Sequence, residues 1–210
     1  MALILKQESK GSSFPRLEPG VYPAICYGVV DIGEQYNKKF DKTARQVVLL
    51  WELPTEKVEV DGEDVSRVIS KTYNMSLNEK ATLRQTLKSW RGRDFTADEL
   101  QGFDLLNILG AHCLLNITNN ETTDGKVYTN IDAVTPISKG MQKPTQTLQS
   151  FSFDLDTDPL ERLEQMPKWI AERIKASNTY QMRINAAQNV PAEAGEFTEI
   201  DNADDGALPF

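Results

Sequence analysis

The sequence predicts a mainly β protein built on a five-stranded barrel, with helical insertions and an acidic C-terminal tail. Three observations lead to this fold class. Five runs rich in β-branched, aromatic and leucine residues are separated by polar loops or Asp-Gly turns. One amphipathic helical pattern falls between the third and the fourth run. The last 20 residues contain six acidic residues and no basic residue, which is typical of a solvated tail.

The first three runs predict antiparallel hairpins. A polar loop at 34–44 separates the first run from the second. Asp61-Gly62 predicts a tight turn before the third run, because both central positions of such a turn need positive φ. In the third run, alternate residues share a face, but the alternation alone leaves open which face is the core. The expected strands are 20–33, 45–53 with an extension at 58–60, and 65–77.

A helix is expected after the third strand. Its predicted start is a capping box, in which Ser76 caps the helix and Glu79 reaches back to the cap residue. Leu83, Leu87 and Trp90 recur at helical spacing and form an apolar stripe. The stripe predicts that one side of this helix packs on the sheet.

The remaining elements complete a recognisable order. A second capping box at 96–99 predicts a short helix toward Gly102. Further strands are expected at 111–118 and 127–137, and a last helix at 167–177. Five strands with a helix between the third and the fourth follow the order of the OB-fold barrel. The predicted arm, OB-fold domain, linker with C-terminal helical segment, and tail occupy residues 1–17, 18–137, 138–187 and 188–210.

Net charge at first argues against a nucleic-acid partner, because the whole chain carries −8. The tail holds six of these negative charges, which leaves only −2 for the other 190 residues. The core is therefore nearly neutral and can carry a local basic face. No apolar run approaches the roughly 20 residues needed to span a bilayer. Two separated cysteines fit a reducing compartment, so we expect a cytoplasmic protein.

The expected barrel suggests where nucleic acid would bind. An OB-fold uses its second and third strands and the loops after its first and fourth strands. Basic side chains can follow phosphates, and flat rings such as Tyr36, Phe40 and Tyr73 can stack on unpaired bases. A basic stripe on the first helix is weaker support, since charged helix faces are usually just solvated. The candidate nucleic-acid-binding residues are Tyr36, Lys38, Lys39, Phe40, Lys42, Arg45, Arg67, Lys71, Tyr73, Arg84, Lys88, Arg91 and Arg93.

Patterns for catalysis or metal binding are sparse. The single histidine, His112, lies in an apolar strand, where a structural role is the simpler expectation. Asp154, Asp156 and Asp158 mimic the start of a calcium loop, but the glycine and glutamate required later in such a loop are absent. We therefore expect no enzymatic activity, no cofactor and no metal. A metal-dependent nuclease and an adaptor without DNA affinity are the alternatives.

The C-terminal tail has the composition of a docking peptide. Its end joins acidic side chains to an apolar tip, and the last residue offers both a ring and a free carboxylate. A partner can hold the ring in an apolar pocket and the carboxylate with Arg or Lys. The candidate partner-binding residues are Asp204, Asp205, Leu208, Pro209 and Phe210.

This tail resembles that of bacterial and phage single-stranded DNA-binding proteins, which end in acidic residues, an aliphatic residue, Pro and Phe. The stretch 73–96, with Trp90-Arg91-Gly92-Arg93, is also similar to a family of phage single-stranded DNA-binding proteins. The resemblance implies an OB-fold, sequence-tolerant binding of single strands in the host bacterial cytoplasm, and recruitment of replication or recombination proteins by the tail. Gly206-Ala207, between the acids and Leu208, departs from the usual tail.

Overall fold

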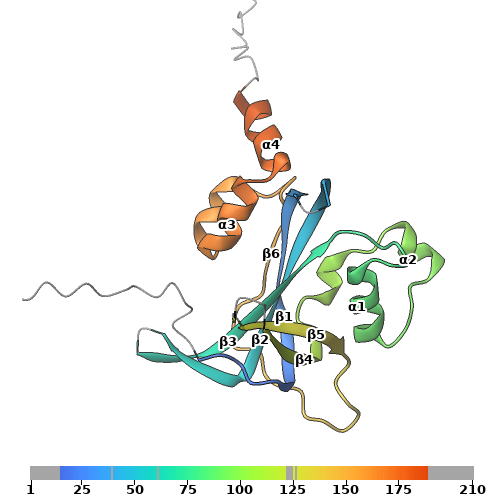
Figure 1. Ribbon diagram of the computed structural model, residues 1–210, viewed down its shortest axis with the longest axis vertical. Helices are drawn as coiled ribbons and strands as arrows, with labels where there is room; N and C mark the ends of the chain where they lie inside the picture. Colours follow the sequence, from blue (N-terminus) through green and yellow to red (C-terminus); the bar gives the residue numbers. More distant parts are fainter. Residues whose placement is uncertain (1–14, 39, 61, 122–124, 126, 189–210) are drawn as a thin grey trace, which may run out of the picture.

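A computed structural model describes residues 15–38, 40–60, 62–121, 125 and 127–188. Its centre is a curled antiparallel sheet with the strand order β3-β2-β1-β4-β5 (Figure 1). A short sixth strand pairs in parallel with β1. The fold is therefore mainly β with few helices, as predicted, and its sheet forms a half-barrel. The strands are β1 (Gly20–Asn37), β2 (Lys42–Val60), β3 (Glu63–Asn74), β4 (His112–Glu121), β5 (Val127–Thr135) and β6 (Phe151–Phe153).

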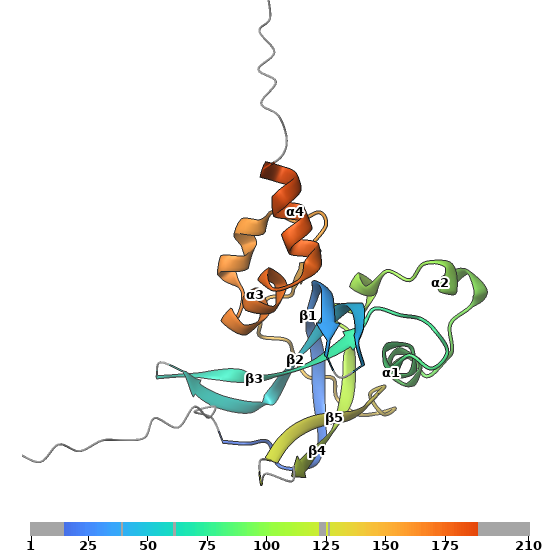
Figure 2. The same ribbon diagram turned by 45° about the horizontal axis from the view of Figure 1, so that its top comes forward.

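The helices are short and gather in two groups. Figures 1 and 2 both show α1 and α2 on one side of the sheet and α3 and α4 together on another. The predicted last helix corresponds to α3, whereas β6 and α4 were not predicted. In the described ranges, no helix has the length and apolarity needed to cross a membrane. The helices are α1 (Thr82–Arg91), α2 (Ala97–Gln101), η1 (Leu105–Ile108), η2 (Leu160–Gln165), α3 (Lys168–Lys175) and α4 (Asn178–Gln188).

The hairpin of β1 and β2 is longer than predicted. Residues expected in a polar loop continue the strand ladder, so that Tyr36 lies opposite Thr43. The ladder changes register near Gly33, whose φ is +70°. A Cβ added to Gly33 would lie 2.7 Å from the Leu155 side chain, so only glycine fits there. A bulge of this kind bends its strand and increases the local twist of the hairpin.

Helix α1 covers one end of the inner core. Its residues Leu83, Leu87 and Trp90 are buried, which confirms the predicted apolar stripe. The Trp90 indole donates a hydrogen bond to the His112 carbonyl (2.9 Å), and its ring centroid lies 6.1 Å from that of Trp51. The stripe therefore fixes α1 against both β2 and β4.

The two predicted capping boxes have different outcomes. The first is wrong: α1 begins only at Thr82, and Ser76 accepts a hydrogen bond from the Asn78 amide (3.2 Å) instead. Ser76 thus stabilises a local turn, which serines favour as readily as a helix start. The second is confirmed, because Thr96 and Glu99 exchange the expected pair of hydrogen bonds at the start of α2.

A second hydrophobic layer covers the outer face of the sheet. The C-terminal segment supplies this layer, and its apolar side chains are as deeply buried as those of the inner core. Burial of each such side chain contributes about 1.5–3 kcal/mol, so the segment is an integral part of the fold. Val30, Ile32, Val48 and Leu50 of the sheet contact Phe153, Leu155, Leu163, Ile170 and Ile174.

A chain segment without regular structure, here called the strap (residues 138–150), is anchored to the sheet by Glu52. This carboxylate is fully buried in β2 and accepts hydrogen bonds from the amides of Thr147 (3.1 Å) and Leu148 (3.1 Å) and from the Thr147 hydroxyl. Burial alone would raise the pKa of Glu52, but these hydrogen bonds outweigh it and hold the pKa below its ordinary value. Glu52 therefore ties the strap to the outer face as a carboxylate.

Replacing Glu52 should destabilise the protein. In Glu52→Gln, an NH2 group replaces one carboxylate oxygen and cannot accept a hydrogen bond from the backbone N–H groups of the strap. We therefore expect the free energy of unfolding at pH 7 to fall by about 1–3 kcal/mol in urea titrations. Because the folded-state pKa is lowered, the contribution of Glu52 is present above its unfolded pKa of about 4.3 and is lost as the pH falls. The difference between the two proteins should therefore shrink at acidic pH.

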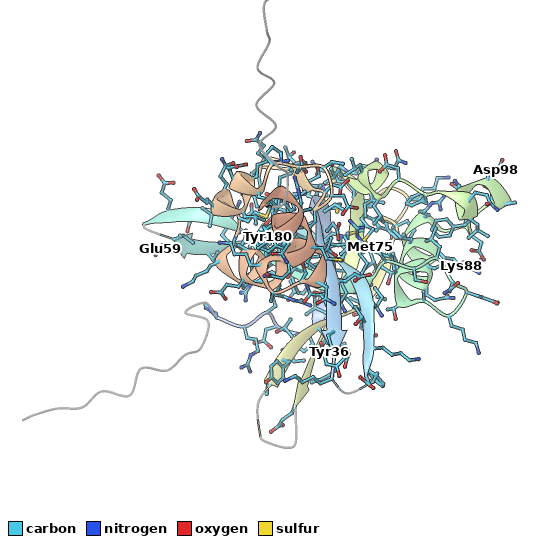
Figure 3. All side chains as sticks on the ribbon, turned by 90° about the horizontal axis from the view of Figure 1, so that it is seen from above. Tyr36, Glu59, Met75, Lys88, Asp98 and Tyr180 are labelled. Carbon is cyan, nitrogen blue, oxygen red and sulfur yellow. The ribbon has the colours of Figure 1, made fainter. Side chains whose placement is uncertain are left out.

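The matched control is Glu59→Gln, which changes an exposed carboxylate at the far end of the β2–β3 hairpin (Figure 3). We expect this variant to unfold with wild-type stability. Equal stability of Glu52→Gln and wild type at pH 7 would show that Glu52 does not anchor the strap.

Candidate nucleic-acid interface

The tip of the β1–β2 hairpin presents two aromatic rings to solvent. Tyr36 is 56% exposed and Phe40 is 64% exposed. Lys38 and Lys42 beside them are also exposed, whereas Lys39 lies outside the described residues. Figure 3 shows Tyr36 at the hairpin end, well away from the helical insertion. The tip thus combines flat rings with cations, the two groups that single strands require.

A hydrogen bond orients the Tyr36 ring. The Tyr36 hydroxyl donates to the Asp41 carboxylate (2.8 Å), and this bond raises the pKa of Tyr36 above its ordinary value. Asp41 has a φ of +48°, in the left-handed region that tight turns use and that Asp tolerates better than most residues. The turn thereby holds one ring of the tip in a defined position.

Arg45, predicted to bind phosphate, is held by acidic neighbours instead. Its guanidinium pairs with Asp31 and with Asp156 (2.7 Å), and Asp154 lies 3.9 Å away. The hydrogen bond to Asp31 is the main reason that the pKa of Arg45 is raised. A DNA phosphate would have to compete with these carboxylates, so Arg45 is better described as a structural residue.

Strand β3 places its predicted residues on the inner face of the sheet. Tyr73 is 2% exposed and belongs to the inner core, so its predicted role as a stacking ring is wrong. Lys71 is half-buried; its ammonium donates to the Ile131 carbonyl of β5 (2.7 Å) and lies 5.5 Å from the Tyr73 ring centroid. Burial lowers the pKa of Lys71. Arg67, also on β3, lines a hollow of about 590 Å³ with Tyr22.

The basic stripe of α1 is largely neutralised by two acidic residues. Asp94 pairs with Lys88 (2.7 Å) and Arg84 (3.3 Å), and the hydrogen bond from Lys88 is the main cause that lowers the pKa of Asp94 to about 2. Glu99 pairs with Arg93 (2.8 Å) and with Arg91. Its pKa is also lowered to about 2, mainly by Arg93.

Arg91 is further restrained by aromatic rings. Its guanidinium lies 4.6 Å from the Phe95 centroid and 5.0 Å from that of Phe103. Arg84, Lys88, Arg91 and Arg93 thus all have carboxylate partners, and this makes the helical stripe a weaker candidate than the hairpin tip.

An exposed ring on β5 was missed by the sequence analysis. Tyr128 on β5 is 53% exposed and lies opposite Asn120 of β4. Alternation along β5 could have identified it, because Ile131 is buried and every second residue from 128 to 132 is exposed. Tyr128 lies close to the β4–β5 loop, one of the two loops by which an OB-fold binds its ligands.

The residues considered for catalysis and metals have structural contacts. His112 hydrogen-bonds the Pro144 carbonyl through Nε2 (3.0 Å) and so helps to hold the strap. Asp154 and Asp156 surround Arg45, and Asp158 pairs with Arg162 (2.7 Å). In the part of the chain that the structure describes, no group of three or more His, Cys, Asp or Glu residues is placed to hold a metal ion.

Comparison with known proteins adds no family assignment. The chain matches no protein-family model and no curated protein. The predicted partner-binding residues of the tail lie outside the described residues. The interface is therefore argued from the geometry of the hairpin tip and the sheet.

Proposed function

We propose that this protein binds single-stranded DNA without strong sequence preference, as a non-enzymatic member of a phage replication or recombination module. The fold supports this proposal. The strand order β3-β2-β1-β4-β5, with α1 between β3 and β4, is compatible with an OB-fold barrel opened between β3 and β5. The resemblance of residues 73–96 and of the tail to phage single-stranded DNA-binding proteins points the same way.

The observation that carries the proposal is the exposed hairpin tip. Tyr36 and Phe40 are largely exposed, and a base that stacks on an aromatic side chain contributes about 1–3 kcal/mol. Lys38 and Lys42 lie close enough along the chain to pair with the neighbouring phosphates. Stacking is tolerant of sequence because every base has a flat face.

Chain segments that cover part of the sheet limit where DNA can bind. On the outer face, Arg173 of α3 donates to the Thr72 hydroxyl of β3 (2.9 Å), and Ser66 hydrogen-bonds Thr147 of the strap (2.9 Å). The outer surface of β2 and β3, which many OB-folds use, is thus partly covered by other segments of the chain, with Val68 of β3 still exposed. The hairpin tip, with Tyr128 as a second stacking candidate, is the surface we assign to DNA.

Removing either ring should weaken DNA binding. Tyr36→Ala and Phe40→Ala should each lower the affinity for oligo-dT by about 5- to 150-fold, which corresponds to the loss of one stacked base. Anisotropy of a fluorescently labelled oligo-dT is the suitable readout, because Trp51 and Trp90 are buried and do not report on the tip.

The control is Trp169→Ala, which removes an exposed ring of α3 and should leave the affinity unchanged. The salt dependence gives a second readout. Neutralisation of about three phosphates by the tip lysines predicts a slope of log affinity against log salt near −2. Wild-type affinity in both ring variants, or a flat salt dependence, would contradict the proposal.

We further propose that the tail recruits replication or recombination proteins and competes with DNA for the basic tip, since it is tethered and polyanionic. Deletion of residues 201–210 should therefore leave oligo-dT binding equal or stronger. A clear loss of DNA affinity would contradict this role.

Two other outcomes of the DNA-binding experiments would indicate a different function for the protein. Degradation of the labelled DNA with Mg²⁺ or Mn²⁺ would indicate a metal-dependent nuclease. No binding of oligo-dT, together with tail-dependent binding of a partner protein, would indicate an adaptor.

A further inference from the structure

A second surface, distinct from the hairpin tip, has the shape and charge of a docking site. We call it the acidic–apolar cleft: a hollow of about 650 Å³ between the residues that follow β6 and those that form the start of η1. Figure 3 shows Met75, one of its residues, between Tyr180 on α4 and Lys88 on α1. Sites that bury small ligands or peptide side chains have volumes of about 300–1,000 Å³, so the cleft is large enough for several side chains.

The polar lining of the cleft is strongly negative. Five aspartates and a single basic residue, Arg45, line it. Arg162, from outside the lining, pairs with one of the five carboxylates. Three carboxylate charges of the lining are therefore not balanced by these two cations. The lining aspartates are Asp31, Asp104, Asp154, Asp156 and Asp158.

The apolar lining of the cleft is open to solvent. Met75 is 42% exposed and Leu106 is 49% exposed, and Phe103 also lines the cleft. Large apolar side chains that gather in a hollow, and are bordered by charge, mark binding surfaces more often than scattered exposed ones do. An occupant must therefore offer apolar groups as well as positive charge.

Internal hydrogen bonds fix the carboxylates before any ligand arrives. Asp104 accepts from the Leu106 amide (2.8 Å), and Asp154 accepts from the Asp156 amide (2.9 Å). Each of these carboxylates keeps a second oxygen that can accept a further bond. A fixed acceptor loses little conformational freedom on binding, which favours even a short ligand.

We propose that the acidic–apolar cleft docks a peptide segment of a partner protein in which an arginine or lysine is flanked by leucine-like side chains. The cation contacts the aspartates, and the apolar side chains cover Met75 and Leu106. Nucleic acid is excluded because its phosphates would face the unbalanced carboxylates. The cleft and the hairpin tip are thus two different surfaces, the first for a partner protein and the second for DNA. The proposal for the cleft does not depend on DNA binding.

Three synthetic tripeptide amides test this recognition: acetyl-Leu-Arg-Leu, acetyl-Leu-Glu-Leu and acetyl-Ser-Arg-Ser. The readout is the NMR shift of the Met75 and Leu106 methyl groups in the full-length protein. We expect the first peptide to shift both methyl groups in a saturable manner. The Glu peptide should bind about 10- to 150-fold more weakly, as expected for the loss of one charge-assisted bond. The Ser peptide should also bind more weakly.

Matched variants locate the site. Asp104→Asn keeps the hydrogen bond to the Leu106 amide, since Asn and Asp serve equally well there, but removes a charge from the cleft. It should weaken binding of the Arg peptide, whereas Asp98→Asn on α2 should not. In the same way, Leu106→Ser should weaken binding and Leu100→Ser, which changes an exposed leucine of α2, should not. Circular dichroism checks that all four variants fold.

Several results would overturn the proposal. Equal binding of the three peptides, or equal effects of Asp104→Asn and Asp98→Asn, would show that the cleft does not select its ligand. Methyl shifts that change with protein concentration would assign the cleft to a second copy of this chain. Shifts on deletion of residues 1–14, which include Leu3-Ile4-Leu5-Lys6, would assign it to the chain's own N-terminal residues.

Discussion

Burial of β1 on both of its faces is the constraint on which the rest of the structure depends. Ala24 and Cys26 point into the inner core, whereas Val30 and Ile32 point into the outer layer. The same strand pairs with β2, β4 and β6. A strand held in this way leaves little sheet surface for a ligand, so the surfaces open to binding lie at hairpin tips and at the ends of the curled sheet.

This constraint explains which predictions from sequence succeeded. The mainly β character of the fold and the buried stripe of α1 follow from local patterns that tertiary packing reinforces. A local pattern also indicated that the outer face is covered, because residues 24–32 lack the alternation of polar and apolar residues that a half-exposed strand shows. What covers that face could not be predicted, since β6 has only three residues and α4 has no clear apolar side.

The candidate site shows the same limit at single residues. Tyr36 and Tyr73 occur in similar basic surroundings in the sequence, yet one ring is exposed and the other is in the core. Alternation grouped Tyr73 with Lys71, and only the curling of the sheet turns that face toward the inner core. Likewise, Lys88 and Asp94 are paired because the chain reverses after α1, a contact that charge patterning along one helix does not reveal.

The central claim is that single-stranded DNA contacts the β1–β2 hairpin tip and does not displace the segments that contact Ser66 and Thr72 on the outer face of β3. Backbone amide shifts on titration with oligo-dT test it most directly. The account predicts that the largest shifts cluster at residues 36–42, with those of Ser66 and Thr72 nearly unchanged. Shifts centred on Ser66 and Thr72, with unchanged amide signals at the hairpin tip, would contradict it.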